Sequence, residues 1–254
     1  MFNWDLLSEA IFVGGDNFVK MWKDKLFLNG LKISFIFIGI EVPAILALEI
    51  LFAVLFSKLG RFSQKVYLTI FFMPVITPWL VVIMMWGFIF YPNVGLLSGF
   101  GQLFGLDIVS PLAFRDTALY AMIVMTIWKF VGFGTVIFLV GINEVPAVQY
   151  EAAIIDGAGP WAQFRHITLP LIRPILLGMS IVSFIGALQI FEPFFIMTRG
   201  GPIDATRTFS LYLYQQAFDQ LRFGYSSAMA FFMFILLLGI SVIQLVVVRS
   251  RWEY

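Results

Sequence analysis

The segment QYEAAIIDGAGPWAQFRHITLP, residues 149–170, is a polar interruption in a chain that is otherwise 61% hydrophobic. Ala152 and Ala153 are strong helix formers and lie among Glu and Gln residues, so a short helix is expected here. Gly157 then permits a sharp turn, and Pro160 suits the first position of a second short helix. We therefore predict two short helices joined by a turn, forming a compact projection between long apolar segments.

The second of these helices has one apolar edge. Trp161, Phe164 and Ile167 recur at intervals of three residues, which places them along one side of the helix. With the Glu151 carboxylate at its other end, such a projection suits docking into a second protein. The simpler interpretation is an ordinary connecting loop, and these residues alone do not decide between the two.

The composition indicates a membrane protein. The chain has 254 residues, of which 12% are charged and 30 are phenylalanine. A soluble domain does not carry so much apolar surface, so several membrane crossings are expected. The formal net charge of +1 gives no indication of nucleic-acid binding. The chain contains no cysteine and one histidine, His166, so we expect neither a metal nor another cofactor bound by this chain.

Five segments are long and apolar enough to cross the bilayer as helices, which takes about 20 residues each. They are Phe27–Phe56, Tyr67–Tyr91, Ala118–Gly141, Leu171–Phe191 and Ser226–Val248. These runs are too long for barrel strands and lack two-residue alternation. The predicted fold class is therefore all-α, a polytopic bundle of membrane helices. Pro74 and Pro78 predict a bend in the second span, either as a packing feature or in a helix that lines a moving pathway.

The loop resembles the EAA loop of the permeases of binding-protein-dependent ABC importers at every spacing. The residues that carry this resemblance are Glu151, Ala152, Ala153, Gly157, Ile167, Leu169 and Pro170, with Asp156 beside them. Weaker similarity to the carbohydrate-importing branch of the family extends over most of the chain. It lies in Pro74, Pro78, Trp86, Gly95, Met197–Pro202, Thr206, Thr208, Tyr212, Tyr214, Ala217, Phe218 and Gly224–Ala228. Ser98 departs from the pattern, since that branch usually has Asn after Gly-Leu-Leu.

The resemblance implies the type I ABC importer permease fold, also called MetI-like, in the plasma (inner) membrane of a prokaryote. The EAA loop, residues 142–170, would face the cytoplasm, as would the C-terminus. Residues 1–26 would form an extracytoplasmic segment, and residues 27–254 the transmembrane permease domain. The positive-inside rule does not decide the orientation, because basic residues are spread almost evenly between the two sides. Family members usually have six core helices, so we expect the usual first core helix to be missing.

The resemblance also implies the partners. The chain has no Gly-rich phosphate loop, and we expect no enzymatic activity from it. A separate cytoplasmic ATPase dimer would use ATP, and a second homologous permease would complete the path. An extracytoplasmic solute-binding protein would deliver a sugar or related solute to outer loops that include Thr198–Thr208. The ATPase-coupling residues would be Glu151, Ala152, Ala153, Asp156, Gly157, Ile167, Leu169 and Pro170.

Charged residues inside the predicted spans have several interpretations. Glu41, Glu49 and Lys129 would each be costly in lipid, so we expect them to face protein or water. A buried ion pair of Glu41 with Lys129 would hold helices together. Alternatively, the chain would be an ion-coupled secondary transporter that uses these three residues. A third interpretation is a polar, solute-lining path, whose candidate residues are Trp86, Trp128, Gln189 and Glu192.

Overall fold

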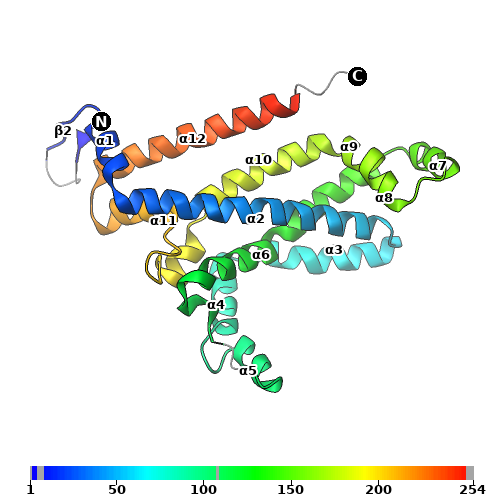
Figure 1. Cartoon of the computed structure of the whole chain (residues 1–254), viewed down its shortest axis with the longest axis horizontal. Helices are drawn as coiled ribbons and strands as arrows, with labels where there is room; N and C mark the ends of the chain where they lie inside the picture. Colours follow the sequence, from blue (N-terminus) through cyan, green and yellow to red (C-terminus); the bar gives the residue numbers. More distant parts are fainter. Residues whose placement is uncertain (1, 5–8, 107–108, 250–254) are drawn as a thin grey trace. The chain divides into compact units, whose positions relative to one another are not determined.

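The computed structural model describes residues 2–4, 9–106 and 109–249 (Figure 1). The described chain is almost entirely helical, which confirms the predicted fold class. Its α-helices are α1 (Asp16–Lys23), α2 (Lys25–Ser57), α3 (Arg61–Ile76), α4 (Trp79–Ile89), α5 (Leu96–Leu103), α6 (Arg115–Asn143), α7 (Ala147–Ile155), α8 (Pro160–Gln163), α9 (Leu169–Leu171), α10 (Arg173–Gln189), α11 (Phe209–Tyr214) and α12 (Phe223–Arg249). Shorter turns of 3-10 or π-helix are η1 (Pro111–Ala113), η2 (Phe164–Thr168), η3 (Phe194–Thr198) and η4 (Gln215–Asp219).

A minimal antiparallel ladder near the N-terminus was not predicted. Strand β1 (Phe2–Asn3) pairs with β2 (Ile11–Phe12), and Phe2 lies opposite Phe12. The backbone carbonyl of Trp4 also accepts a hydrogen bond from the amide of Gly224, at 3.1 Å. These contacts tie the N-terminal segment to the start of α12. The C-terminal residues 250–254, which we expect to be cytoplasmic, lie outside the described residues.

Four of the predicted membrane spans are single long helices in the part of the chain that the structure describes. The apolar helical segments are Lys25–Ser57, Arg115–Asn143, Arg173–Thr198 and Phe223–Val246. Each is long enough to cross the hydrocarbon region, since a helix rises about 1.5 Å per residue. The predicted long apolar helices at these four places are thereby confirmed.

The second predicted span, Tyr67–Tyr91, is broken into two helices. Helix α3 ends at Ile76 and α4 begins at Trp79, so the pair makes a fifth span only if counted together. Thr77 is extended, with φ −70° and ψ 128°, because the ring of the following proline disfavours the helical region. Pro74, by contrast, lies inside α3. Pro78 therefore marks the break, and the sequence did not distinguish the two prolines.

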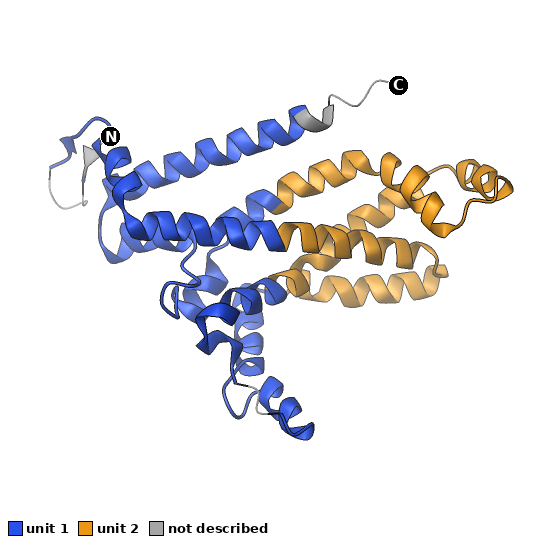
Figure 2. Cartoon of the chain, in the orientation of Figure 1, with its two compact units in different colours: residues 1–40, 78–125, 184–254 blue, residues 41–77, 126–183 orange. Residues whose placement is uncertain are grey.

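The chain divides into two compact units (Figure 2). Unit 1 comprises residues 1–40, 78–125 and 184–254, and unit 2 comprises residues 41–77 and 126–183. Helices α2, α6 and α10 each contribute one part to unit 1 and the other part to unit 2.

The core of unit 2 joins the second half of α2 to α6 and to the start of α10. Phe56, Phe138 and Ile172 are among its buried members. The Phe71 ring of α3 packs against Phe52 and Phe56, with ring centroids 4.7 and 5.1 Å apart. This core supports both helices that lead into and out of the loop 142–170.

The core of unit 1 joins the start of α2 to α11 and to the start of α12. Phe27 is fully buried and meets Phe209 and Phe232 edge to face, at centroid distances of 5.5 and 5.8 Å. Met21 of α1 belongs to the same cluster. The first turns of α2 and α12 are thus held at one end of unit 1.

Candidate functional site

The loop 142–170 lies within unit 2 and contains the predicted helix–turn–helix. Helix α7 ends in a Schellman motif, in which the two residues after the C-cap residue Asp156 donate back to its last turn. The amide of Gly157 donates to the Ile154 carbonyl at 3.0 Å, and that of Ala158 donates to the Ala153 carbonyl at 2.8 Å. Gly157 has φ +77°, a left-handed conformation that glycine adopts at little cost. The predicted need for glycine at this turn is confirmed.

The second half of the loop begins at Pro160, as predicted, and continues through α8, η2 and α9 into α10. The π-helical turn η2 was not predicted. The Tyr150 hydroxyl of α7 and the Thr168 hydroxyl of η2 share a hydrogen bond of 2.9 Å. The Gln163 side chain donates to the Ala158 carbonyl at 2.9 Å. The first bond holds the segments on either side of the turn together, and the second ties α8 to the turn itself.

Four large apolar side chains of this loop are exposed. Val148, Ile154, Ile155 and Trp161 expose 71%, 62%, 86% and 70% of their areas. We call these four residues the apolar loop surface. Large apolar side chains that gather on a projection commonly mark an interaction site. An ordinary connecting loop would gain nothing from exposing them, whereas a docking loop would cover them with a partner.

The predicted coupling residues occupy two environments in this loop. Glu151, Ala152, Asp156, Gly157 and Pro170 are exposed, whereas Ala153, Ile167 and Leu169 are half-buried. The exposed residues are available to a partner. The half-buried ones support the loop from within.

Lys129 of α6 has a structural role that the sequence did not predict. Its ammonium donates to the carbonyls of Thr77, Pro74 and Val75, at 2.7, 3.1 and 3.4 Å. The last carbonyls of a helix have no partner within the helix, and a cation there is favoured by the helix dipole. Lys129 thus caps the end of α3 at the break. The suggested ion pair of Lys129 with Glu41 stays a prediction, whereas the three carbonyl contacts tie Lys129 to the end of α3.

Two buried carboxylates of α2 lie in the same unit. Glu49 is 1% exposed and Glu41 5%, and one oxygen of each, Oε2, has no hydrogen-bond partner among the described residues. Gly134 of α6 lies against the Glu49 carboxyl, and a Cβ at that position would overlap it. The absence of a side chain at residue 134 therefore makes room for this carboxyl group.

The four residues predicted to line a solute path do not form a described site. Trp86 lies in α4 and packs on Phe90, with ring centroids 5.1 Å apart. Trp128 lies in α6 and is 37% exposed. Gln189 is the last residue of α10 and Glu192 follows three residues later; both are exposed. Their role in a solute path stays a prediction.

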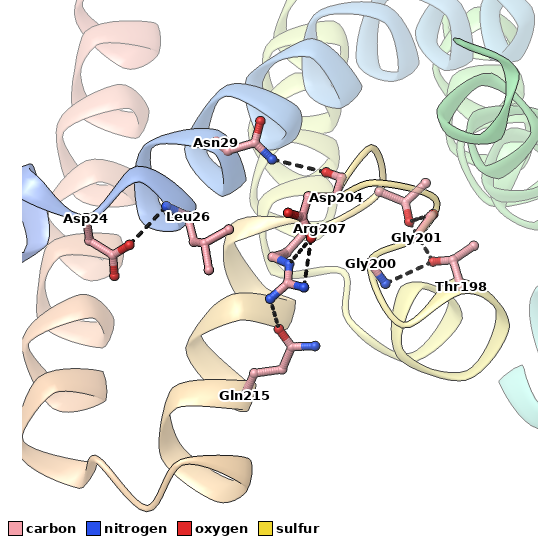
Figure 3. Close-up of polar contacts among 10 residues, drawn as sticks. Asp24, Leu26, Asn29, Thr198, Gly200, Gly201, Asp204, Arg207 and Gln215 are labelled. Carbon is pink, nitrogen blue, oxygen red and sulfur yellow. Dashed lines mark hydrogen bonds and ion pairs between the residues drawn. The ribbon is translucent and has the colours of Figure 1, made fainter. Parts of the chain in front are cut away.

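The segment Thr198–Thr208 is a well-ordered loop of unit 1, held by its own side chains (Figure 3). The Thr206 hydroxyl donates to the Gly201 carbonyl at 2.6 Å and lies 2.7 Å from the Thr198 hydroxyl. The Arg207 guanidinium lies between the Asp204 carboxylate and the Gln215 side chain, and donates to each. Several threonines that carry the family resemblance therefore stabilise the loop itself.

The Asp24 carboxylate, between α1 and α2, forms hydrogen bonds with α2, α11 and α12 of unit 1. The sequence did not predict this role. Asp24 Oδ2 accepts hydrogen bonds from the Tyr212 and Tyr225 hydroxyls, at 2.5 and 2.9 Å, and Oδ1 accepts from the Leu26 amide at 2.9 Å. Burial acts to raise the pKa of Asp24, but these hydrogen bonds outweigh it and hold the pKa below its usual value. The available signal was an aspartate directly before a helix, a common N-cap.

Comparison with known proteins agrees with this architecture. The probable ABC transporter permease protein YurN of Bacillus subtilis (strain 168) is 33% identical over 249 residues, which cover 96% of this chain and 85% of that protein. The trehalose/maltose transport system permease protein MalF of Thermococcus litoralis is 29% identical and covers 96% of this chain and 82% of that protein. The lactose transport system permease protein LacF of Rhizobium radiobacter is 26% identical, and the match covers 94% of this chain and 82% of that protein.

The fold has a close counterpart among solved structures. A bacterial ABC transporter involved in the import of the acidic polysaccharide alginate matches with a TM-score of 0.88 at 23% identity, covering 95% of this chain and 85% of that chain. Residues 49–253 match the family of binding-protein-dependent transport system inner membrane components. The matched range begins near the C-terminal end of α2 and holds the loop 142–170 and the capped break. The chain therefore belongs to the family of binding-protein-dependent transport system inner membrane components, the permeases of ABC transporters.

Proposed function

We propose that this permease takes up a sugar or related solute, driven by ATP hydrolysis on a separate cytoplasmic ATPase dimer. A second homologous permease completes the path, and an extracytoplasmic solute-binding protein delivers the solute. Support for a sugar comes from the names of the relatives, which include trehalose/maltose and lactose transport proteins. The alternative of an ion-coupled secondary transporter loses its support, because the chain belongs to a different class of transporter and Lys129 caps a helix end.

The observation that carries the proposal is the apolar loop surface on a rigid projection. Ile155 and Trp161 are too exposed to stabilise this chain by burial, so their apolar area is available to a partner. Glu151 lies on the same helix as Ile155 and supplies a carboxylate for an Arg or Lys of that partner. The occupant we propose is a cleft of the cytoplasmic ATPase.

The internal bonds of the loop explain how such docking would drive transport. Movement of α7 is passed to η2 through the bond between Tyr150 and Thr168, and η2 continues through α9 to α10. Closure of the ATPases would therefore displace α10 through a stiff connection. Such a displacement can switch the permease between inward-open and outward-open packings.

The test is Ile155→Asp in the assembled complex. Losing one buried isoleucine from the interface costs about 2 kcal/mol, or roughly thirtyfold in affinity. Less ATPase should therefore co-purify with the permease. Leu103→Asp is the matched control, because Leu103 is 80% exposed and lies in α5, on the side we predict to be outer. Equal ATPase recovery from both variants would contradict the docking proposal.

A further inference from the structure

A cavity of about 680 Å³ lies in unit 1 beside the first turns of α2 and α12. Polar and charged side chains form most of its wall. They are Lys20, Lys23, Asp24, Arg207, Tyr212, Gln215, Gln216, Asp219, Gln220 and Arg222, with Leu26 as the apolar member. None of the predicted coupling residues and none of the candidate solute-path residues lines the cavity. The function of the cavity is therefore a separate question from coupling and from the solute path.

The cavity wall has more cations than carboxylates. Four of its side chains are Lys or Arg, and two are Asp. Arg207 is committed to Asp204, with 2.8 Å between guanidinium nitrogen and carboxylate oxygen. Lys20, Lys23 and Arg222 are exposed. Arg222 donates to the Gln216 side chain at 3.3 Å, which leaves most of its five N–H donors for another acceptor.

The Asp24 carboxylate uses both oxygens for hydrogen bonds within the protein, while it keeps its negative charge. Both oxygens of Asp24 already accept from the Tyr212 and Tyr225 hydroxyls and from the Leu26 amide. The Lys20 ammonium lies 5.1 Å from the centre of the Tyr225 ring, which holds it beside the cavity. With Arg207 paired to Asp204, three cations of the wall remain against the two carboxylates Asp24 and Asp219, so an anionic ligand would meet an excess of positive charge.

The position of the cavity in the membrane narrows the choice of anion. Apolar sequence begins at Leu26 in α2, three residues after the cavity residue Lys23, and at Phe223 in α12, directly after the cavity residue Arg222. Trp22, which is 53% exposed, meets Phe232 of α12 at a ring distance of 5.5 Å. Exposed tryptophans and lysines are typical of the boundary between hydrocarbon and headgroups. Lipid phosphates lie at this level.

We propose that the cavity binds the phosphate of an anionic lipid headgroup. Lys23 and Arg222 provide the charge-assisted hydrogen bonds, and the side-chain amides of Gln215 and Gln220 are donors for other headgroup oxygens. Leu26, 37% exposed, forms an apolar wall for the glycerol carbons. The bound lipid would bridge the starts of α2 and α12. This site is independent of which solute the permease carries.

The test compares lipid binding to the full chain and to two double variants in detergent, by native mass spectrometry. The probes are short-chain phosphatidylglycerol, phosphatidylcholine of the same chain length, and inorganic phosphate. The test variant is Lys23→Gln with Arg222→Gln. The control is Lys25→Gln with Arg115→Gln, which removes one exposed Lys and one exposed Arg that do not line the cavity. Each basic residue near a lipid surface is worth about fivefold in affinity.

The proposal expects phosphatidylglycerol to bind in preference to phosphatidylcholine. It also expects the test variant to bind phosphatidylglycerol roughly 25-fold more weakly, while the control changes little. Equal losses in both double variants, or none, would overturn it. Inorganic phosphate that binds with the same variant dependence while the lipid does not would overturn the lipid assignment. Weaker capture of the solute-binding protein by the test variant, with lipid binding unchanged, would make this a protein-docking surface instead.

Discussion

At the scale of single residues, the most specific prediction for the coupling loop concerns Glu151. The side chain is exposed, so replacing it should not disturb folding. Glu151→Lys reverses the charge presented to the ATPase and should uncouple ATP hydrolysis from uptake, lowering transport about tenfold or more for a desolvated pair. The measurement is uptake and ATPase activity of the reconstituted complex.

The matched control is Glu9→Lys, the same charge change at an exposed residue of the predicted extracytoplasmic segment. It should leave coupling unaffected. Unchanged uptake by the Glu151→Lys complex would show that this carboxylate makes no productive contact with the ATPase.

Asp24 gives a prediction about stability and pH. Its pKa is below the ordinary value of 3.8 in the folded chain, so it contributes stability above that value. The contribution is lost as the pH falls from about 3.8 through the lower, folded pKa. Burial and Asp24 together raise the pKa of Tyr212, which therefore stays protonated and donates at neutral pH.

Tyr212→Phe should remove one of these hydrogen bonds and destabilise the chain by about 1.5–3 kcal/mol, because the acceptor is charged. Thermal unfolding in detergent near pH 7 and well below the ordinary pKa, at about pH 2, measures the effect. The difference between wild type and variant should shrink at the lower pH. A difference that is the same at both values would mean that the hydroxyl does not act through the Asp24 carboxylate.

At the scale of elements, the packing of α6 on α3 depends on a glycine. A Cβ at Gly132 would overlap the backbone carbonyl of Phe71, which cannot move aside as a flexible side chain could. Gly132→Ala should therefore destabilise the chain by about 1–3 kcal/mol through overpacking. Gly178→Ala in α10 is the control, because no atom lies within 4 Å of its added Cβ.

Thermal unfolding of the isolated chain in detergent measures both variants. Gly178→Ala should be neutral or stabilising by up to about 1 kcal/mol, since alanine has the higher helix propensity. If the two alanines behaved alike, the close approach of α6 to α3 would be refuted.

Much of the element structure follows from the sequence, and the exceptions have physical reasons. Apolar length alone located four spans, and helix propensity with Gly157 and Pro160 located the helix–turn–helix. The role of Lys129 was not predictable, because its acceptors come from residues 52–55 positions away in the chain. The cavity was missed for the same reason, since it joins residues 20–26 with residues 207–222. Side-chain partners of this kind depend on tertiary packing, which local patterns do not encode.

At the scale of the whole molecule, the open question is orientation in the membrane. The family resemblance predicts that the loop 142–170 faces the cytoplasm and that α5 lies outside. The chain contains no native cysteine, so a single introduced cysteine reports one position without further engineering. Ile155 and Leu103 are suitable positions because they are 86% and 80% exposed.

Labelling with a membrane-impermeant maleimide on right-side-out vesicles measures the orientation. Leu103→Cys should label in intact vesicles, and Ile155→Cys only after permeabilisation. The opposite pattern would invert the topology and remove the loop from the reach of a cytoplasmic ATPase.

The lysine cap on α3 has a consequence for biogenesis. Lys129 satisfies the carbonyls at the proline break from within the same polypeptide. The break therefore needs no donor from another subunit and can form as soon as α6 has left the translocon. Each subunit would then enter assembly with the break already formed. Its backbone carbonyls at the break would have hydrogen-bond donors before any partner subunit binds, so they would not face lipid unsatisfied.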